Sequence, residues 1–142
     1  MRFNPLDIAR RLVATRSTPE AGTREIAYYA GALMELMGLS VDVRETEHGG
    51  LAQANVLGTI GPESEEDLLV NVHLDTVPPG DASLWTKCGG DPFRLARDGD
   101  ALYGLGAADA KVGLVPALMG LRALEPAKMR ARLTLVASYG EE

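Results

Sequence analysis

The chain has 142 residues, 46% hydrophobic and 24% charged, a balance typical of one globular domain with a core rather than a disordered chain. Its formal net charge of −6 argues against nucleic acid or an anionic membrane as the main partner, because both are negatively charged. The single cysteine, Cys88, cannot form an internal disulfide, which fits a reducing compartment. Residues 1–16 lack the pattern of a secretory signal, and no apolar run approaches the roughly 20 residues of a membrane span. The sequence therefore predicts a cytoplasmic protein.

Two helices are expected in the first forty residues. Asn4 can cap a helix that begins at Pro5 and runs to about Ala14. Thr23 is expected to cap the second helix, which Gly38 would end. The apolar residues of this second segment recur at helical spacing: Ile26, Ala30, Leu33, Met34 and Met37.

Strands dominate the rest of the chain. Residues 41–43 alternate as a half-exposed strand, and 55–60 form another candidate. The continuous apolar run 68–72 predicts a central strand buried on both faces. A helix is expected within 110–124 and a last strand at 132–138. This order favours an α/β fold with a mixed, mostly parallel central sheet flanked by helices.

The first chemical motif lies at the end of the predicted central strand. His73 and Asp75 are two residues apart, so an extended backbone would place both side chains on one face. The imidazole could then bind a metal ion, while the carboxylate holds its tautomer. The alternative is a core histidine followed by a turn aspartate. His48, in a glycine-containing turn, has no such partner and is expected to face solvent.

The second motif is the glycine-containing segment 104–113, which joins a strand-like stretch to the predicted helix. It partly resembles a dinucleotide-binding loop, but Asp109 stands at the third glycine position and would repel a pyrophosphate. A carboxylate at such a tight turn suits a metal ligand that bridges two cations with its two oxygens. The alternative role for Asp109 is a helix cap.

The third motif is Glu141-Glu142, which follows the predicted last strand. Adjacent residues point in different directions, so one carboxylate could bind metal while the other takes a proton from water. The alternative is a solvated acidic segment without a metal.

Together the three motifs resemble the M20 family of metallopeptidases and deacylases. The resemblance rests on His73-Leu74-Asp75-Thr76-Val77-Pro78, on Leu102-Tyr103-Gly104-Leu105-Gly106-Ala107-Ala108-Asp109-Ala110-Lys111-Val112-Gly113, and on Ser138-Tyr139-Gly140-Glu141-Glu142. It covers essentially the whole chain and implies a zinc-peptidase-like catalytic domain.

The resemblance also implies a role for each site residue. His73 would bind one zinc ion, Asp109 would bridge two, and Glu142 would bind the second. Glu141 would be the general base and acid, and Asp75 would orient the imidazole of His73. Cobalt or manganese would fit the same ligands.

Two positions depart from the family pattern: Leu105 stands where arginine is frequent, and Val112 where glycine is frequent. Neither is a ligand position. Members of the family also have a further carboxylate ligand, an inserted dimerisation domain and a late histidine ligand. Residues 1–142 are therefore expected to be the N-terminal part of such a catalytic domain, with weak metal binding and little activity on their own.

The expected function of the complete protein is metal-dependent hydrolysis of an N-acyl amino acid or a peptide, by water that the metal activates and Glu141 deprotonates. A homodimer is implied by the same resemblance. The alternatives are a noncatalytic fragment or subunit that needs a second chain to complete the metal site, and a nucleotide-binding α/β domain.

Overall fold

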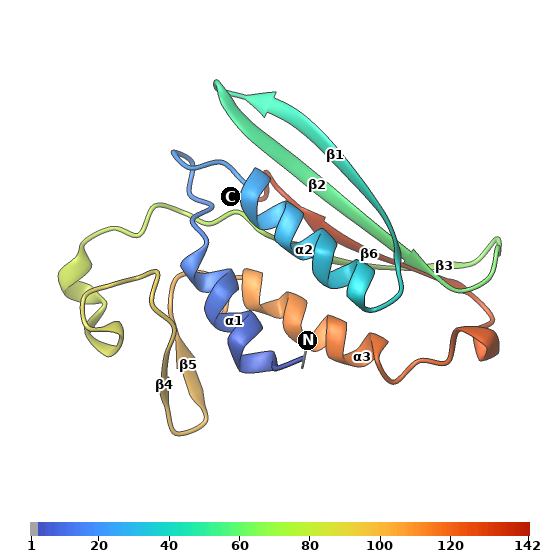
Figure 1. Ribbon diagram of the computed structural model, residues 1–142. Helices are drawn as coiled ribbons and strands as arrows, with labels where there is room; N and C mark the ends of the chain where they lie inside the picture. The colour runs from blue at the N-terminus through green and yellow to red at the C-terminus, as the bar shows by residue number, and fades with distance from the viewer. Residues whose placement is uncertain (1–2) are drawn as a thin grey trace.

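The computed structural model describes residues 3–142, which form a mixed sheet with three helices and a small separate hairpin (Figure 1). The helices are α1 (Pro5–Ala14), α2 (Arg24–Leu36) and α3 (Leu114–Leu121). The strands are β1 (Ser40–His48), β2 (Leu51–Ile60), β3 (Asp67–His73), β4 (Ala96–Asp98), β5 (Ala101–Tyr103) and β6 (Arg132–Ser138). Among the described residues, no helix is long and apolar enough to cross a membrane.

The main sheet has the strand order β1-β2-β6-β3. Strands β1 and β2 form an antiparallel hairpin, β2 pairs antiparallel with β6, and β6 pairs parallel with β3. The mixed α/β class is confirmed. The expected majority of parallel pairs is not met within residues 3–142, because the tight turn at Gly49-Gly50 joins β1 and β2 directly and so forces them antiparallel.

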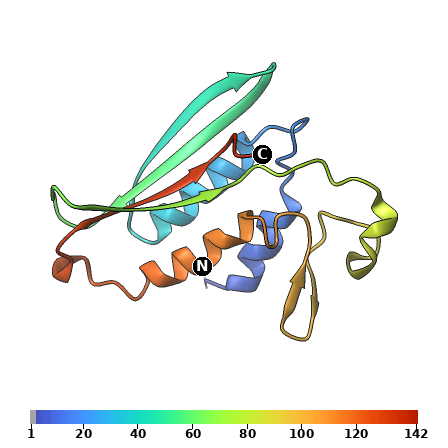
Figure 2. The same ribbon diagram turned by 180° about the vertical axis from the view of Figure 1, so that it is seen from behind.

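All three helices lie on one face of the sheet, as the two opposite views show (Figures 1 and 2). Fully buried apolar side chains fill the core between the helices and this face: Leu12, Ile26, Met34, Val56, Leu114, Leu118 and Leu135. Gly31 of α2 faces the strands, where an added Cβ would lie in ordinary van der Waals contact, 3.5 Å from Val41 and Val56.

The first helix follows the sequence expectation, and the second differs at its start. The side chain of Asn4 accepts a hydrogen bond from the backbone N–H of Leu6, as an N-cap should. Thr23 occupies the N-cap position of α2 but makes no capping bond. Its hydroxyl instead donates to Gln53 and accepts from the N–H of Ala54, which ties the start of α2 to β2.

The prediction of a central strand buried on both faces at 68–72 was wrong for the described chain. Strand β3 lies at an edge of the sheet, and the side chains of Leu68 and Leu69 are 59% and 62% exposed. An apolar run specifies a preference for burial but not the number of neighbouring strands. Burial increases only toward the end of the strand, at His73.

The predicted helix within 110–124 is shorter than expected. A 3₁₀ turn at Lys111–Gly113 precedes α3, and Pro116 lies in the first turn of α3, where its missing N–H costs no hydrogen bond. The residues before Leu114 belong to a compact loop that carries Asp109. This loop brings Asp109 to the sheet edge at which β3 and β6 end.

Candidate metal centre

Three parts of the chain meet at one edge of the main sheet. Strands β3 and β6 are parallel neighbours, with His73 in register with Ser138, so their carboxyl ends lie side by side. Glu142 follows β6, and Asp109 comes from the loop before α3. One ligand atom from each of His73, Asp109 and Glu142 lies within 4.8 Å of the other two. Residues far apart in the sequence thus form one cluster of possible metal ligands.

The imidazole of His73 is buried and held from both sides. Its Nδ1 lies 3.1 Å from the backbone carbonyl oxygen of Asp75, and its Nε2 lies 2.8 Å from Oδ1 of Asp109. A carbonyl oxygen can only accept, so Nδ1 carries a proton. In neutral imidazole, Nε2 would then be an acceptor facing a carboxylate acceptor. The arrangement requires either a second proton on the ring or a cation between the two groups.

The surroundings of His73 favour its protonated form when no cation is present. Burial lowers the pKa of His73, but the hydrogen bond that the protonated ring donates to Asp109, the carbonyl of Asp75 and the charges of Asp75 and Glu141 act in the opposite direction. The net effect raises the pKa of His73 above the ordinary value of 6.5. The same negative groups that attract a proton would attract a metal cation.

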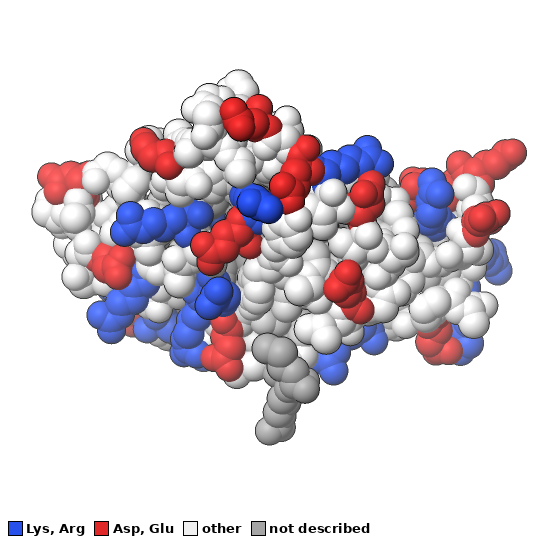
Figure 3. Space-filling model, turned by 45° about the horizontal axis from the view of Figure 1, so that its top comes forward, with Lys and Arg blue, Asp and Glu red and all other residues white. Residues whose placement is uncertain are grey.

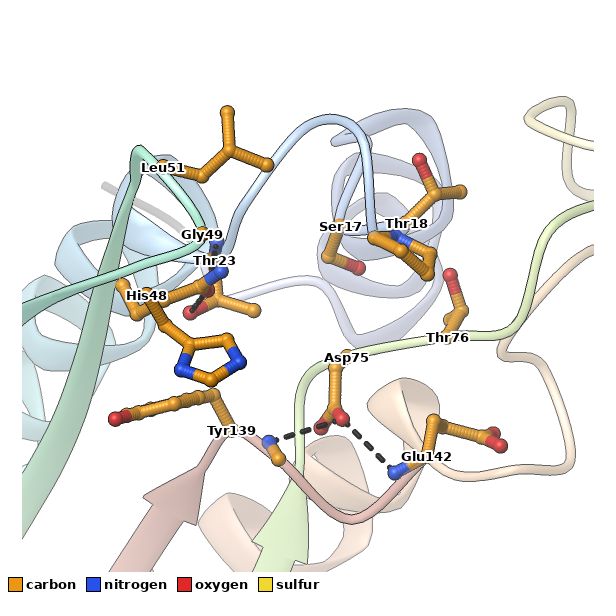
Figure 4. Close-up of a pocket in the computed structure, with 13 residues that line it drawn as sticks. Ser17, Thr18, Thr23, His48, Gly49, Leu51, Asp75, Thr76, Tyr139 and Glu142 are labelled. Carbon is orange, nitrogen blue, oxygen red and sulfur yellow. Dashed lines mark hydrogen bonds between the residues drawn. The ribbon is translucent and has the colours of Figure 1, made fainter.

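Asp75 is buried behind the histidine and holds the backbone that follows β6. Its Oδ2 accepts hydrogen bonds from the N–H groups of Gly140, Glu141 and Glu142 at 3.0, 2.9 and 3.0 Å. Figure 4 draws two of these bonds, those from Gly140 and Glu142. Among residues 3–142, its Oδ1 has no hydrogen-bond partner, and this oxygen lies 3.5 Å from Nδ1 of His73. The expected contact to the imidazole is therefore long, and the shorter one comes from the backbone carbonyl of Asp75. The carboxylate itself fixes the path of residues 140–142.

The other carboxylates of the cluster reach into solvent. The side chains of Asp109 and Glu141 are 79% and 60% exposed, and Glu142 is also exposed. Oε2 of Glu141 lies 3.7 Å from Nε2 of His73, outside hydrogen-bonding distance. Glu141 is thus near the three clustered ligands but is not one of them.

A hollow of about 480 Å³ opens beside Asp75 and Glu142 (Figure 4). Its wall combines residues from the turn after α1, the β1–β2 hairpin tip and the segment after β6. His48, expected to be merely solvent-exposed, is exposed and also lines this hollow. Sequence reasoning did not identify Ser17 or Gln53 as part of it, because neither residue belongs to a motif.

Sequence reasoning also did not single out Lys111. It is fully buried, and burial lowers its pKa to about 8. The sequence shows that Lys111 lies two residues after Asp109. Its burial could not be predicted, because lysine side chains are almost always exposed. Other charged side chains lie at the surface, and on the face drawn in Figure 3 the acidic and basic ones are interspersed.

The donor set of the cluster fits a divalent metal ion. One imidazole and two carboxylates are ligands that zinc accepts in catalytic sites. The hydrogen bond from Nδ1 to a carbonyl is the usual support for a metal-binding histidine, because it leaves Nε2 free to bind. The 2.8 Å distance between Nε2 of His73 and Oδ1 of Asp109 fits a proton between them or a cation that replaces it.

Comparison with known proteins gives both sequence and structural relatives. The model of Peptidase family M20/M25/M40 matches residues 69–142. Acetylornithine deacetylase of Pectobacterium carotovorum subsp. carotovorum (strain PC1) is 39% identical over 106 residues, which cover 75% of this chain and 26% of that protein. Acetylornithine deacetylase of Salmonella paratyphi B is 33% identical over 144 residues, covering 96% of this chain and 36% of that protein.

Among solved structures, the fold is similar to the M20 family metallo-carboxypeptidase Sso-CP2 from Sulfolobus solfataricus. The TM-score is 0.78 at 21% sequence identity, and the match covers 96% of this chain and 31% of the carboxypeptidase. This similarity supports the fold alone. The chain thus spans between about a quarter and a little over a third of the length of these relatives.

Proposed function

The chain belongs to peptidase family M20/M25/M40, and from that premise we propose that the complete protein is a metal-dependent amide hydrolase. Its proposed substrates are N-acyl amino acids or short peptides. The residue roles, the metal and the substrate class are proposals, since the chain covers only part of each relative. The observation that carries the proposal is the convergence of His73, Asp109 and Glu142 at the carboxyl ends of β3 and β6.

In this proposal, His73, Asp109 and Glu142 hold the metal, which is zinc or, with the same ligands, cobalt or manganese. When bound, the cation supplies Lewis-acid chemistry, which makes water acidic enough to deprotonate near neutral pH and polarises the substrate carbonyl. His73 binds through Nε2 because the carbonyl of Asp75 keeps the proton on Nδ1. The side chain of Asp109 is 79% exposed, so its carboxylate would be available to hold a cation.

Glu141 is the proposed general base. Its carboxylate is exposed and lies beside the ligand cluster, with Oε2 3.7 Å from Nε2 of His73. It would take a proton from the attacking water and return it to the leaving amine. Asp75 contributes by fixing the backbone N–H groups of Glu141 and Glu142, so that the two side chains leave the chain in different directions.

We further propose that residues 1–142 are the N-terminal part of the catalytic domain of a cytoplasmic homodimer. Further ligands and the dimerisation domain would come from other parts of the complete protein. The exposure of Asp109, Glu141 and Glu142 fits this proposal, since water competes strongly at an open site. Residues 1–142 alone are expected to bind metal weakly and to turn over little substrate.

The test is the change Glu141→Gln in the complete protein, assayed with a panel of N-acyl amino acids and dipeptides. Loss of a general base should lower kcat by about 10²–10⁴-fold while the bound metal per chain stays the same. Glu125→Gln is the matched control, because Glu125 is an exposed glutamate paired only with Lys128. Unchanged turnover in Glu141→Gln would remove the base assignment, and absence of hydrolysis in the unaltered protein would remove the proposed function.

A further inference from the structure

Lys111 has an unusual environment for a lysine. Its side chain has no exposed surface and is the largest of the fully buried side chains. Within residues 3–142, its ammonium group donates a hydrogen bond to the backbone oxygen of Thr15, at 3.0 Å. Burying a charged group is costly unless it gains a specific interaction, so a single buried lysine indicates a particular structural use.

The partner of Lys111 lies at the end of the first helix. Thr15 is the C-cap of α1, and its own N–H still bonds to the carbonyl of Arg11. The carbonyl groups at a helix C-terminus carry partial negative charge, which a nearby cation stabilises. Lys111 thus connects the loop before α3 to α1, which is about 96 residues away in sequence.

The glycines of this loop make room for the connection. At Gly106, with φ of 79°, an added Cβ would lie 2.4 Å from Cε of Lys111. At Gly104, an added Cβ would lie 2.8 Å from Val13 of α1. The loop is closed across this lysine stem by the hydrogen bond from the N–H of Val112 to the carbonyl of Gly106. Both glycines therefore serve close packing of the loop against Lys111 and α1.

We propose that Lys111 is a positioning residue that fixes Asp109 at the metal centre by anchoring the loop 104–113 to the C-terminus of α1. Asp109 needs such an outside constraint, since its side chain is 79% exposed and contacts the imidazole of His73 through Oδ1. The anchor acts on the backbone of the loop and makes no hydrogen bond to the carboxylate of Asp109. The inference rests on the proposed function in so far as Asp109 is taken as a metal ligand.

The experiment uses the complete protein with Lys111→Met, which keeps much of the side-chain volume and removes the charge and the donor. Two readouts are measured: hydrogen exchange of the peptide spanning 104–113 in metal-free protein, and the cobalt dissociation constant with the cobalt absorption spectrum. We expect faster exchange at Val112, affinity weaker by about 10–100-fold as for loss of other supporting residues around metals, and a changed spectrum.

Two further variants separate positioning from general destabilisation. Leu33→Ala removes a buried core side chain of α2 and should lower stability without changing the cobalt spectrum or exchange in 104–113. Gly106→Ala keeps Lys111 but displaces its side-chain stem, so it should reproduce the effects of Lys111→Met. If Lys111→Met does not fold, Gly106→Ala tests the anchor in its place.

Each outcome bears on a different claim. Unchanged exchange in both loop variants would overturn the anchor, whether or not metal binds. Faster exchange with unchanged cobalt affinity and spectrum would show that the anchor does not position Asp109, which also overturns the inference. If the unaltered protein bound no cobalt, the proposed metal function would fail, and positioning of Asp109 as a ligand would fail with it, while the exchange data would still report on the anchor.

Discussion

The candidate centre has a buried half and an exposed half. His73, Asp75 and Lys111 are buried, and each makes a hydrogen bond to the backbone of a different segment. Asp109, Glu141 and Glu142 are exposed, and the side chains of Asp109 and Glu141 lie near Nε2 of His73. Buried residues therefore constrain the backbone beside the exposed carboxylates. Lys111 lies two positions after Asp109, and Asp75, which follows the neighbouring strand β3, binds the N–H groups of Glu141 and Glu142.

This division explains how a site can be both ordered and available. A carboxylate that is fixed by its own side-chain hydrogen bonds has fewer oxygens left for a metal, and a carboxylate that is buried loses hydration. Here Asp75 and Lys111 are the buried residues that make the hydrogen bonds to the backbone. The carboxylates of the exposed half remain accessible to a metal ion. The two halves should respond differently to substitution, in metal affinity and in stability.

Substitution of the buried ligand His73 should have the largest effect, because it should change both metal affinity and stability. In His73→Ala, the loss of one of three clustered ligands should weaken zinc binding by more than the about 10–100-fold caused by loss of a supporting residue. Calorimetric titration with zinc measures the change. Glu125→Ala, at an exposed residue outside the hollow, should leave the affinity unchanged, and equal losses in the two variants would contradict the assignment.

Substitution of Asp75 should act mainly on stability. Asp75→Ala leaves three backbone N–H groups without their acceptor and should lower the free energy of unfolding by about 1.5–3 kcal/mol. Urea unfolding of the metal-free protein measures this. Asp81→Ala is the control, since Asp81 caps only an exposed 3₁₀ turn and should cost about 1 kcal/mol or less. Similar values for the two would show that Asp75 has no special role.

The pH dependence of metal binding should report on His73. Metal requires the neutral imidazole, and the negative neighbours raise the pKa of His73 in the metal-free protein. Zinc affinity should therefore be level above that raised pKa and fall up to about tenfold for each pH unit below it. The fall should begin above pH 6.5, and a midpoint below that value would contradict the sign of the shift.

The smallest effect is expected at the exposed start of β3. Leu69 is 62% exposed, so Leu69→Thr should change the free energy of unfolding by no more than about 0.5 kcal/mol. It should also leave zinc affinity unchanged, although it lies on the same strand as His73. Urea unfolding with a zinc titration tests both. A loss near that of Asp75→Ala would show that the exposed end of the strand is coupled to the site.

Sequence reasoning identified the residues of the exposed half because their identities carry the signal. Acidic residues after an apolar strand and within a glycine-containing turn are unusual enough to indicate a site. The mixed α/β class and α1 with its Asn4 cap also followed from local patterns. These are features that neighbouring residues in the sequence determine.

His73 and Asp75 were also expected as site residues, but the contacts that hold the buried half could not be derived from the sequence. The three bonds of Asp75 go to backbone N–H groups, which every non-proline residue has, so no residue type indicates them. The contact of Lys111 with Thr15 depends on how α1 packs against the loop before α3. The position of β3 at an edge likewise depends on pairing, which its apolar run does not encode.

The most direct test of the account compares Glu141→Gln with Glu142→Gln in the complete protein, by the number of zinc ions bound per chain and the zinc dissociation constant. The two residues are adjacent and both are exposed, and their backbone N–H groups bond to the same oxygen of Asp75. The account predicts that Glu142→Gln loses zinc while Glu141→Gln retains it and loses turnover. Equal zinc binding by both variants would contradict the assignment of Glu142 as a ligand and Glu141 as the base.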